Sequence, residues 1–265
     1  MVDFNRKESY NVQDLVEIMK LLRAPEGCPW DAEQTHESIK KNLIEETYEV
    51  IEAINKDDKD LLCEELGDLL MQVVFHAQME SEAGVFDFDA VADGVCKKLI
   101  ERHPHVFGDV SISGVDDVLT NWDAIKRKSK KQKTTTESML SVPRELPALM
   151  RATKLQKKAA DVGFDWPDVS GALDKLEEEI AELRLAISNN DRENIAEELG
   201  DILFSAVNVS RFIKTDAEEA LTMASDKFLS RFQKVECLAN EREIDMKSVG
   251  IDELDRLWDE AKSAE

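Results

Sequence analysis

The pattern that decides this fold is a pair of short acidic stretches, Glu45-Glu46-Thr47-Tyr48-Glu49 and Glu64-Glu65-Leu66-Gly67-Asp68. Both stretches return at an offset of 133 residues, as Glu178-Glu179-Ile180-Ala181-Glu182 and Glu197-Glu198-Leu199-Gly200-Asp201. Within a 36-residue window that contains them, 14 positions are identical between the two copies, and the spacing between the motifs is unchanged. The chain therefore contains an internal repeat built around paired carboxylates.

Helix geometry gives these pairs a physical meaning, because residues three apart are neighbours on one helix face. If the two helices form an antiparallel hairpin, Glu46 and Glu49 face Glu65 and Asp68, and the four anions repel unless a cation lies between them. Oxygen ligands without His or Cys suit Mg²⁺, with Mn²⁺ as an alternative. One isolated Glu-x-x-Glu is typical of any acidic surface helix, so the duplication is what favours a metal site.

Glycine interrupts the helical pattern in both copies of the second motif, at Gly67 and Gly200. A glycine inside a helix costs about 1 kcal/mol relative to alanine. Such a cost indicates a packing or functional reason, and we expect close approach of a neighbouring helix.

Composition limits the possible partners. The chain has 265 residues and a formal net charge of −23, which argues against binding a nucleic-acid backbone and implies that anionic ligands need a metal ion. Its four cysteines show no paired spacing, which favours a reducing compartment. We expect no signal peptide and no membrane span, and hence a cytoplasmic protein.

The predicted fold class is all-α, because no segment alternates apolar and polar residues with β-branched enrichment. The repeat predicts two tandem helical domains, residues 1–125 and 148–265, joined by a basic and Thr-rich linker over 126–147. Amphipathic helices in domains of this size often need a partner to cover their apolar stripes, so we also predict a homodimer.

Basic and aromatic residues also recur. Lys98 and Arg102 are four positions apart, as are Lys227 and Arg231, so each pair lies on one helix face. Recurrence favours a phosphate-binding role over solvated surface. Trp122 and Trp258 occupy matching places in the two halves, and for them we hold open two roles, capping of the bundle or stacking on a nucleobase.

These motifs resemble the MazG family of nucleoside triphosphate pyrophosphohydrolases, and the resemblance covers nearly the whole chain. It is carried by the paired carboxylates and by Gly27-Cys28-Pro29-Trp30-Asp31, Glu101-Arg102-His103-Pro104-His105-Val106-Phe107 and Val162-Gly163-Phe164-Asp165-Trp166. The resemblance implies a helical bundle, usually dimeric, that hydrolyses nucleoside triphosphates to monophosphates and pyrophosphate with Mg²⁺. A role in nucleotide-pool control or house-cleaning would follow.

Carried onto this sequence, the resemblance implies metal ligands at Glu179, Glu182, Glu198, Asp201, Glu46, Glu49, Glu65 and Asp68. It implies nucleotide contacts at Lys175, Lys227, Arg231 and Trp258, with Lys98, Arg102 and Trp122 as first-half equivalents. Asn42 stands where the second half has Lys175.

A mechanism follows from these assignments. We expect water, activated by the metal, to attack the α-phosphorus, with Glu178 and Glu179 as catalytic residues. Glu178 would orient or deprotonate the water while Lys227 and Arg231 hold the pyrophosphate.

Two rival interpretations belong to other classes. A di-iron bundle needs Glu-x-x-His motifs on two helices, and the sequence has one, from Glu33 to His36. A non-catalytic nucleotide sensor or helical scaffold is the more serious rival, since retained ligands do not prove turnover.

Because Asn42 carries no charge, we expect the second half to contribute more of the hydrolysis.

Overall fold

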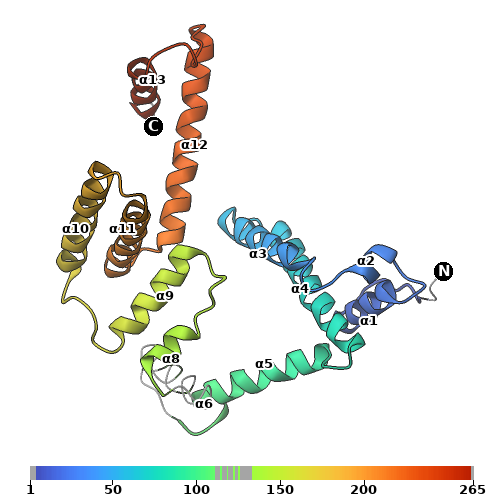
Figure 1. The fold of residues 1–265 in the computed structure, drawn as a ribbon. Helices are drawn as coiled ribbons and strands as arrows, with labels where there is room; N and C mark the ends of the chain where they lie inside the picture. Colours follow the sequence, from blue (N-terminus) through green and yellow to red (C-terminus); the bar gives the residue numbers. More distant parts are fainter. Residues whose placement is uncertain are drawn as a thin grey trace. The chain divides into compact units, whose positions relative to one another are not determined.

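The computed structural model describes residues 4–110, 114, 118, 122, 125 and 133–263, and within these residues the regular structure is entirely helical. The chain divides into two compact units, Met1–Lys126 and Arg127–Glu265, each of which is described by itself below (Figure 1). The predictions of an all-α class and of tandem helical domains are confirmed. None of the described helices has the length and apolar character needed to cross a membrane.

The first unit is organised around a long helical hairpin. Its helices are α1 (Val12–Arg23), α2 (Pro29–Glu33), α3 (Lys40–Asn55), α4 (Lys59–Glu82), α5 (Phe88–Arg102) and α6 (Pro104–Phe107). The side chain of Asn11 accepts backbone hydrogen bonds at the start of α1, and the Asp14 carboxylate accepts one from the Asn11 backbone N–H, so a capping box fixes the start of this helix. Helices α3 and α4 pack along their length, and α1 packs on α4.

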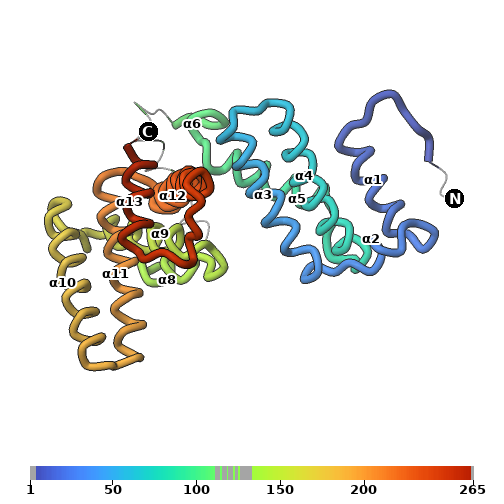
Figure 2. The backbone as a smooth tube through the Cα atoms, turned by 90° about the horizontal axis from the view of Figure 1, so that it is seen from above, coloured from blue at the N-terminus to red at the C-terminus, as the bar shows by residue number. Residues whose placement is uncertain are grey.

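The second unit repeats this plan. Its helices are α8 (Thr135–Leu140), α9 (Ala148–Ala160), α10 (Val169–Ser188), α11 (Arg192–Phe212), α12 (Ala217–Glu241) and α13 (Ile251–Ser263). Helices α10 and α11 form the second hairpin, and they run side by side in both views (Figures 1 and 2). Helix α9 covers one side of α11, while α13 packs on α12.

Both hairpins close through the same short turn. Asp57 and Asn190 occupy equivalent positions with φ of 53° and 54°, the left-handed region that Asp and Asn tolerate better than most residues. Asp58 and Asp191 then cap α4 and α11 through their side chains. The repeated turn sets the register in which the acidic motifs of the two helices face each other.

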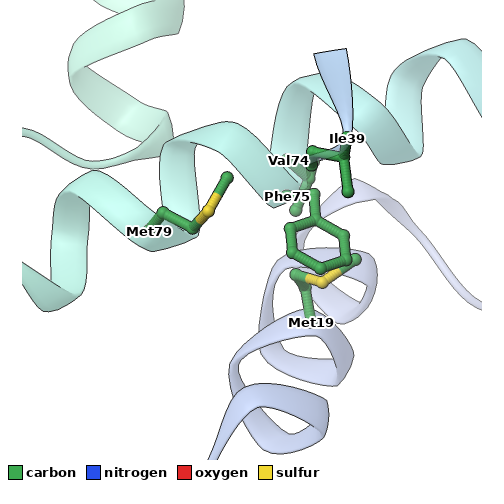
Figure 3. Close-up of a cluster of buried hydrophobic side chains, with 5 residues drawn as sticks. All are labelled: Met19, Ile39, Val74, Phe75 and Met79. Carbon is green, nitrogen blue, oxygen red and sulfur yellow. The ribbon is translucent and has the colours of Figure 1, made fainter. Parts of the chain in front are cut away.

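Two small apolar cores hold the helices. In the first unit, the Phe75 ring of α4 lies between Met19 of α1 on one side and Ile39 with Val74 on the other (Figure 3). In the second unit, Leu257 and Ala261 of α13 pack on Val235 and Ala239 in the C-terminal part of α12. The Phe75 cluster anchors α4, which carries half of the first acidic motif pair.

Part of the predicted linker is ordered structure. Over residues 133–147, Thr134 and Glu137 form a capping box that starts α8, and Ser138 and Val142 are buried. Helix α8 packs on α9. This part was predicted to be linker, but it contains a short capped helix. Residues 126–132 of the predicted linker lie outside the described residues.

Several helices expose apolar stripes within their own unit. Leu173, Ile180 and Ile187 lie seven residues apart on α10 and are 39–57% exposed. An added Cβ at Gly67 or Gly200 would meet no atom within 4 Å. The expectation that a neighbouring helix approaches these glycines is therefore wrong within each unit.

Candidate functional site

The second acidic cluster consists of Glu179, Glu182, Glu198 and Asp201. Glu179 and Glu182 lie one turn apart on α10, and Glu198 with Asp201 lies opposite on α11. Carboxylate oxygens of the first three residues all lie within 4.8 Å of one another. Glu179 is 4% exposed and Glu198 is 9% exposed, so half of this anionic cluster is buried in the hairpin.

Lys175 supplies a positive charge to this cluster. Its Nζ lies 2.8 Å from a carboxylate oxygen of Glu178 and 2.8 Å from one of Glu179. The hydrogen bonds to Glu178 and Glu179 raise the pKa of Lys175, and the hydrogen bond from Lys175 lowers the pKa of Glu179. Lys175, one helical turn before Glu179, thus favours the ionised form of the Glu179 carboxylate although this side chain is buried.

The pKa values of Glu182 and Glu198 in this cluster shift in the opposite direction. The hydrogen bond with Glu179 raises the pKa of Glu182, and burial, followed by the charges of Glu182 and Glu179, raises the pKa of Glu198. Asp201 lies outside the 4.8 Å group but contributes to the repulsion at Glu198. The cluster therefore holds more negative charge than Lys175 neutralises.

The first acidic cluster consists of Glu46, Glu49, Glu65 and Asp68 on α3 and α4. Oxygens of the three glutamates again lie within 4.8 Å of one another, but Glu49 is exposed and the other two are half-buried. Burial, followed by the charge of Asp68, raises the pKa of Glu46. Burial, followed by the charge of Glu49, raises the pKa of Glu65.

Gln72 is a member of this region that sequence reasoning missed. Its Nε2 donates to Glu46 Oε1 at 3.4 Å, its side chain is 4% exposed, and its buried Oε1 has no partner among the described residues. A signal was available, because Gln72 lies four residues after Asp68 and so on the same face of α4. The second half has Ser205 at this position.

The predicted nucleotide contacts of the second half lie on other helices. The Arg231 guanidinium carbon is 5.9 Å from the centre of the Trp258 ring, and Phe228, a neighbour that sequence reasoning missed, is 5.3 Å from Trp258 between ring centres. Lys227 precedes Phe228 on α12. Helix α13 lies beside the C-terminal part of α12, away from the α10–α11 hairpin (Figure 1). Within the second unit, Lys227, Arg231 and Trp258 therefore lie apart from the second acidic cluster.

The first-half equivalents form a different arrangement. Trp122 lies 5.4 Å from His103 between ring centres, Lys98 is exposed, and Arg102 is half-buried with its Nε unpartnered among the described residues. His103 donates through Nδ1 to the Leu99 carbonyl oxygen at 2.6 Å. Trp122 of the first half thus contacts the ring of His103, whereas Trp258 of the second half contacts the guanidinium of Arg231.

The donor sets of both acidic clusters fit a hard divalent cation. They offer carboxylate oxygens alone, they come from two rigid helices, and their mutual repulsion is relieved when a cation enters. In the first cluster the orphaned Oε1 of Gln72 adds a neutral oxygen nearby. The chemistry that such sites support is the binding and activation of polyphosphates.

Comparisons with known proteins agree with this geometry. A family model for the MazG nucleotide pyrophosphohydrolase domain matches residues 34–107 and 169–236, which include both hairpins. The chain is 45% identical over 259 residues to a nucleoside triphosphate pyrophosphohydrolase of Escherichia coli K12, covering 96% of this chain and 98% of that protein.

Two further relatives extend the match. Identity is 45% over 253 residues to the nucleoside triphosphate pyrophosphohydrolase/pyrophosphatase MazG of Thermotoga maritima, covering 96% of each chain. It is 50% over 251 residues to the uncharacterized protein YabN of Bacillus subtilis, covering 94% of this chain and 51% of that protein. Two family matches placed on the two carboxylate hairpins, with relatives aligned over nearly the full length, establish that this chain belongs to the MazG family.

Proposed function

We propose that this protein hydrolyses nucleoside triphosphates to nucleoside monophosphates and pyrophosphate in a Mg²⁺-dependent reaction, with roles in nucleotide-pool control or house-cleaning. The observation that carries the proposal is the second acidic cluster, in which three carboxylates converge within 4.8 Å beside Lys175. The enzyme class itself, nucleoside triphosphate pyrophosphohydrolase, is confirmed by the relatives of high identity and coverage. The metal, the attacked phosphorus and the biological role belong to the proposal.

The residues that would hold the cation are those of the second acidic cluster, with the first acidic cluster as a second site. Oxygen-only donors favour Mg²⁺, and Mn²⁺ has the same preference. When bound, the ion would neutralise negative charge on the triphosphate. When no triphosphate is bound, the ammonium of Lys175 partly neutralises the charge of Glu179.

The proposed chemical step is attack of water on the α-phosphorus. A bond forms between the water oxygen and the α-phosphorus, the bridging bond from that phosphorus to the leaving oxygen breaks, and pyrophosphate departs. Glu178 would accept the proton lost by water. Since Glu178 binds Lys175 in this structure, the lysine must first turn to a phosphate oxygen, which frees Glu178 and adds a charge-assisted contact to substrate.

A second copy of the chain would complete the site. The apolar stripe of Leu173, Ile180 and Ile187 on α10 is uncovered within its unit, and Gly200 of α11 faces open space. Burying such stripes is the usual driving force for association of helical proteins. We propose a homodimer in which the partner covers the hairpin and places Lys227, Arg231 and Trp258 near the carboxylates.

The test is pyrophosphate release from a panel of nucleoside triphosphates, with and without Mg²⁺, in water labelled with ¹⁸O. Attack at the α-phosphorus places the label in the monophosphate, whereas attack at the β-phosphorus places it in pyrophosphate. Glu179→Gln serves as the inactive control, and light scattering measures the mass in solution. Nucleotide binding without any product would instead favour the nucleotide-sensing or scaffold alternative.

A further inference from the structure

A pocket lies between α9 and α11 of the second unit, and none of the four carboxylates of the second acidic cluster lines it. Its volume is about 360 Å³, which is within the range of sites for small organic molecules. Two of its lining residues, Ala152 of α9 and Gly200 of α11, have little or no side chain and so leave room between the helices. An added Cβ at Gly200 would meet no atom within 4 Å.

One side of this pocket is an apolar wall, formed by Leu155 of α9 with Leu203 and Phe204 of α11. Leu203 is 51% exposed and Phe204 is 44% exposed, so both side chains offer apolar surface that a ligand can cover. The ring of Phe204 also offers a face on which a planar group can stack. The wall therefore favours the apolar or aromatic body of a ligand.

Two arginines, Arg144 and Arg151, line the same pocket. Elsewhere in this unit Arg211 pairs with Asp165, but among the residues that the structure describes no carboxylate pairs with Arg144 or Arg151. The Nε atom of Arg151 is buried and has no hydrogen-bond partner there. A buried donor without a partner costs free energy, and a charged donor costs more than a neutral one. These guanidinium groups therefore point to an anion that comes from outside the chain.

We propose that this pocket binds a small amphipathic anion, whose phosphate or carboxylate group contacts Arg144 and Arg151 and whose apolar or aromatic body lies on the apolar wall. The planar guanidinium group matches both kinds of head group, because it donates two parallel hydrogen bonds to two oxygens. The ligand would lie on α11, the helix that also carries Glu198 and Asp201. Binding at this site does not depend on the function proposed above.

The test is isothermal titration calorimetry of the full-length protein with 1-naphthyl phosphate and with 1-naphthoate, in the presence of a chelator. Without metal ions the acidic clusters repel anions, so neither probe can bind to them. 1-Naphthalenemethanol lacks the charge, and inorganic phosphate lacks the apolar body. Both should bind at least about tenfold more weakly than the better naphthyl anion. The tighter of the two naphthyl anions identifies the head group as phosphate or carboxylate.

Variants locate the bound probe. Arg151→Gln should weaken binding of the better anion by about tenfold or more, because it removes a charge-assisted hydrogen bond. Lys154→Gln is the matched control, since it removes one charge from an exposed residue of the same helix that does not line the pocket. Gly200→Leu should abolish binding by filling the pocket, and leucine favours the helix more than glycine does. Arg231→Gln should leave binding intact, which distinguishes the pocket from the contact between Arg231 and Trp258.

Circular dichroism on each variant separates lost binding from lost folding. No binding of either naphthyl anion would overturn the proposal, and this result is expected if side chains of a second copy fill the pocket. Binding that survives both Arg151→Gln and Gly200→Leu, or that disappears with Arg231→Gln, would also overturn it. None of these titrations requires hydrolysis, so failure of the proposed reaction and failure of this inference are distinguishable.

Discussion

In the second unit Lys175 of α10 binds Glu178 and Glu179, whereas the first unit has Asn42 at that position and Gln72 as the polar contact of Glu46. The two hairpins share their turn, their caps and their carboxylate spacing. Among the differences between the two hairpins, Asn42 and Gln72 in place of Lys175 and Ser205 lie one turn from the acidic motifs. The carboxylates are the same in the two clusters, whereas the charged and polar groups beside them differ.

The largest expected effect breaks the second acidic cluster alone. Glu179→Gln should lower Mg²⁺-dependent pyrophosphate release by about a hundredfold or more, because it removes a buried ligand charge and the partner of Lys175. Helical content by circular dichroism should be unchanged, since Gln fills nearly the same volume. Activity close to wild type in a folded variant would reject the assignment of Glu179.

A smaller effect is expected from the lysine that distinguishes the two clusters. Lys175→Met should lower kcat/KM by about tenfold to a hundredfold, the loss of one charge-assisted contact to phosphate. Asn42→Leu is the matched variant in the first half and should change kcat/KM little. Equal losses from the two substitutions would remove the basis of the comparison.

Stability of the metal-free protein should also separate the two clusters. Glu46→Gln relieves repulsion that no lysine among the described residues neutralises, and the melting temperature of the first unit should rise by about 2 °C. Glu179→Gln should give no such rise, because it also removes the partner of Lys175. Differential scanning calorimetry in the presence of a chelator measures both, and a rise at Glu179 alone would contradict the account.

In the first half, Glu80, His36 and His76 form a chain of polar contacts, which should give the stability of this unit a smaller, pH-dependent component. Glu80 Oε1 lies 2.8 Å from His36 Nε2, and His36 Nδ1 lies 2.7 Å from His76 Nδ1. With His36 Nε2–H donating to Glu80, His36 Nδ1 is placed as the acceptor for His76 Nδ1–H. The second half has Val209 in place of His76.

Burial, followed by the charge of His36, lowers the pKa of His76 from its ordinary value of 6.5. The folded state then binds fewer protons than the unfolded state, so the contribution is present above pH 6.5 and is lost as the pH falls below it. The first unit should therefore become less stable as the pH falls through this window.

His76→Val copies the second half and supplies the control. The difference in melting temperature between about pH 7.5 and about pH 5.5 should be smaller in this variant than in the wild type. A difference of the same size would show that the pH effect arises elsewhere.

Sequence reasoning predicted that the paired carboxylates of the two motifs lie together, because residue spacing fixes which side chains share a helix face. Gln72 was missed because its contact with Glu46 depends on how two helices pack, and packing leaves no periodic signal. The α8 helix was missed because its six residues are too few to show apolar periodicity.

The positions of Lys227, Arg231 and Trp258 mark a limit of another kind. Their residue types indicated a phosphate and base site, and Arg231 and Trp258 do lie near each other. Their separation from the second acidic cluster could not be predicted, because it depends on the angle at which α12 leaves α11. The proposed site built from two copies would leave no spacing pattern in one sequence.

The most direct test of the central claim compares two full-length double variants, Glu46→Gln with Glu49→Gln and Glu179→Gln with Glu182→Gln, for pyrophosphate release at saturating Mg²⁺. The account predicts that the second double variant loses nearly all activity while the first keeps most of it. Equal losses, or a larger loss from the first double variant, would contradict the assignment of hydrolysis to the second half.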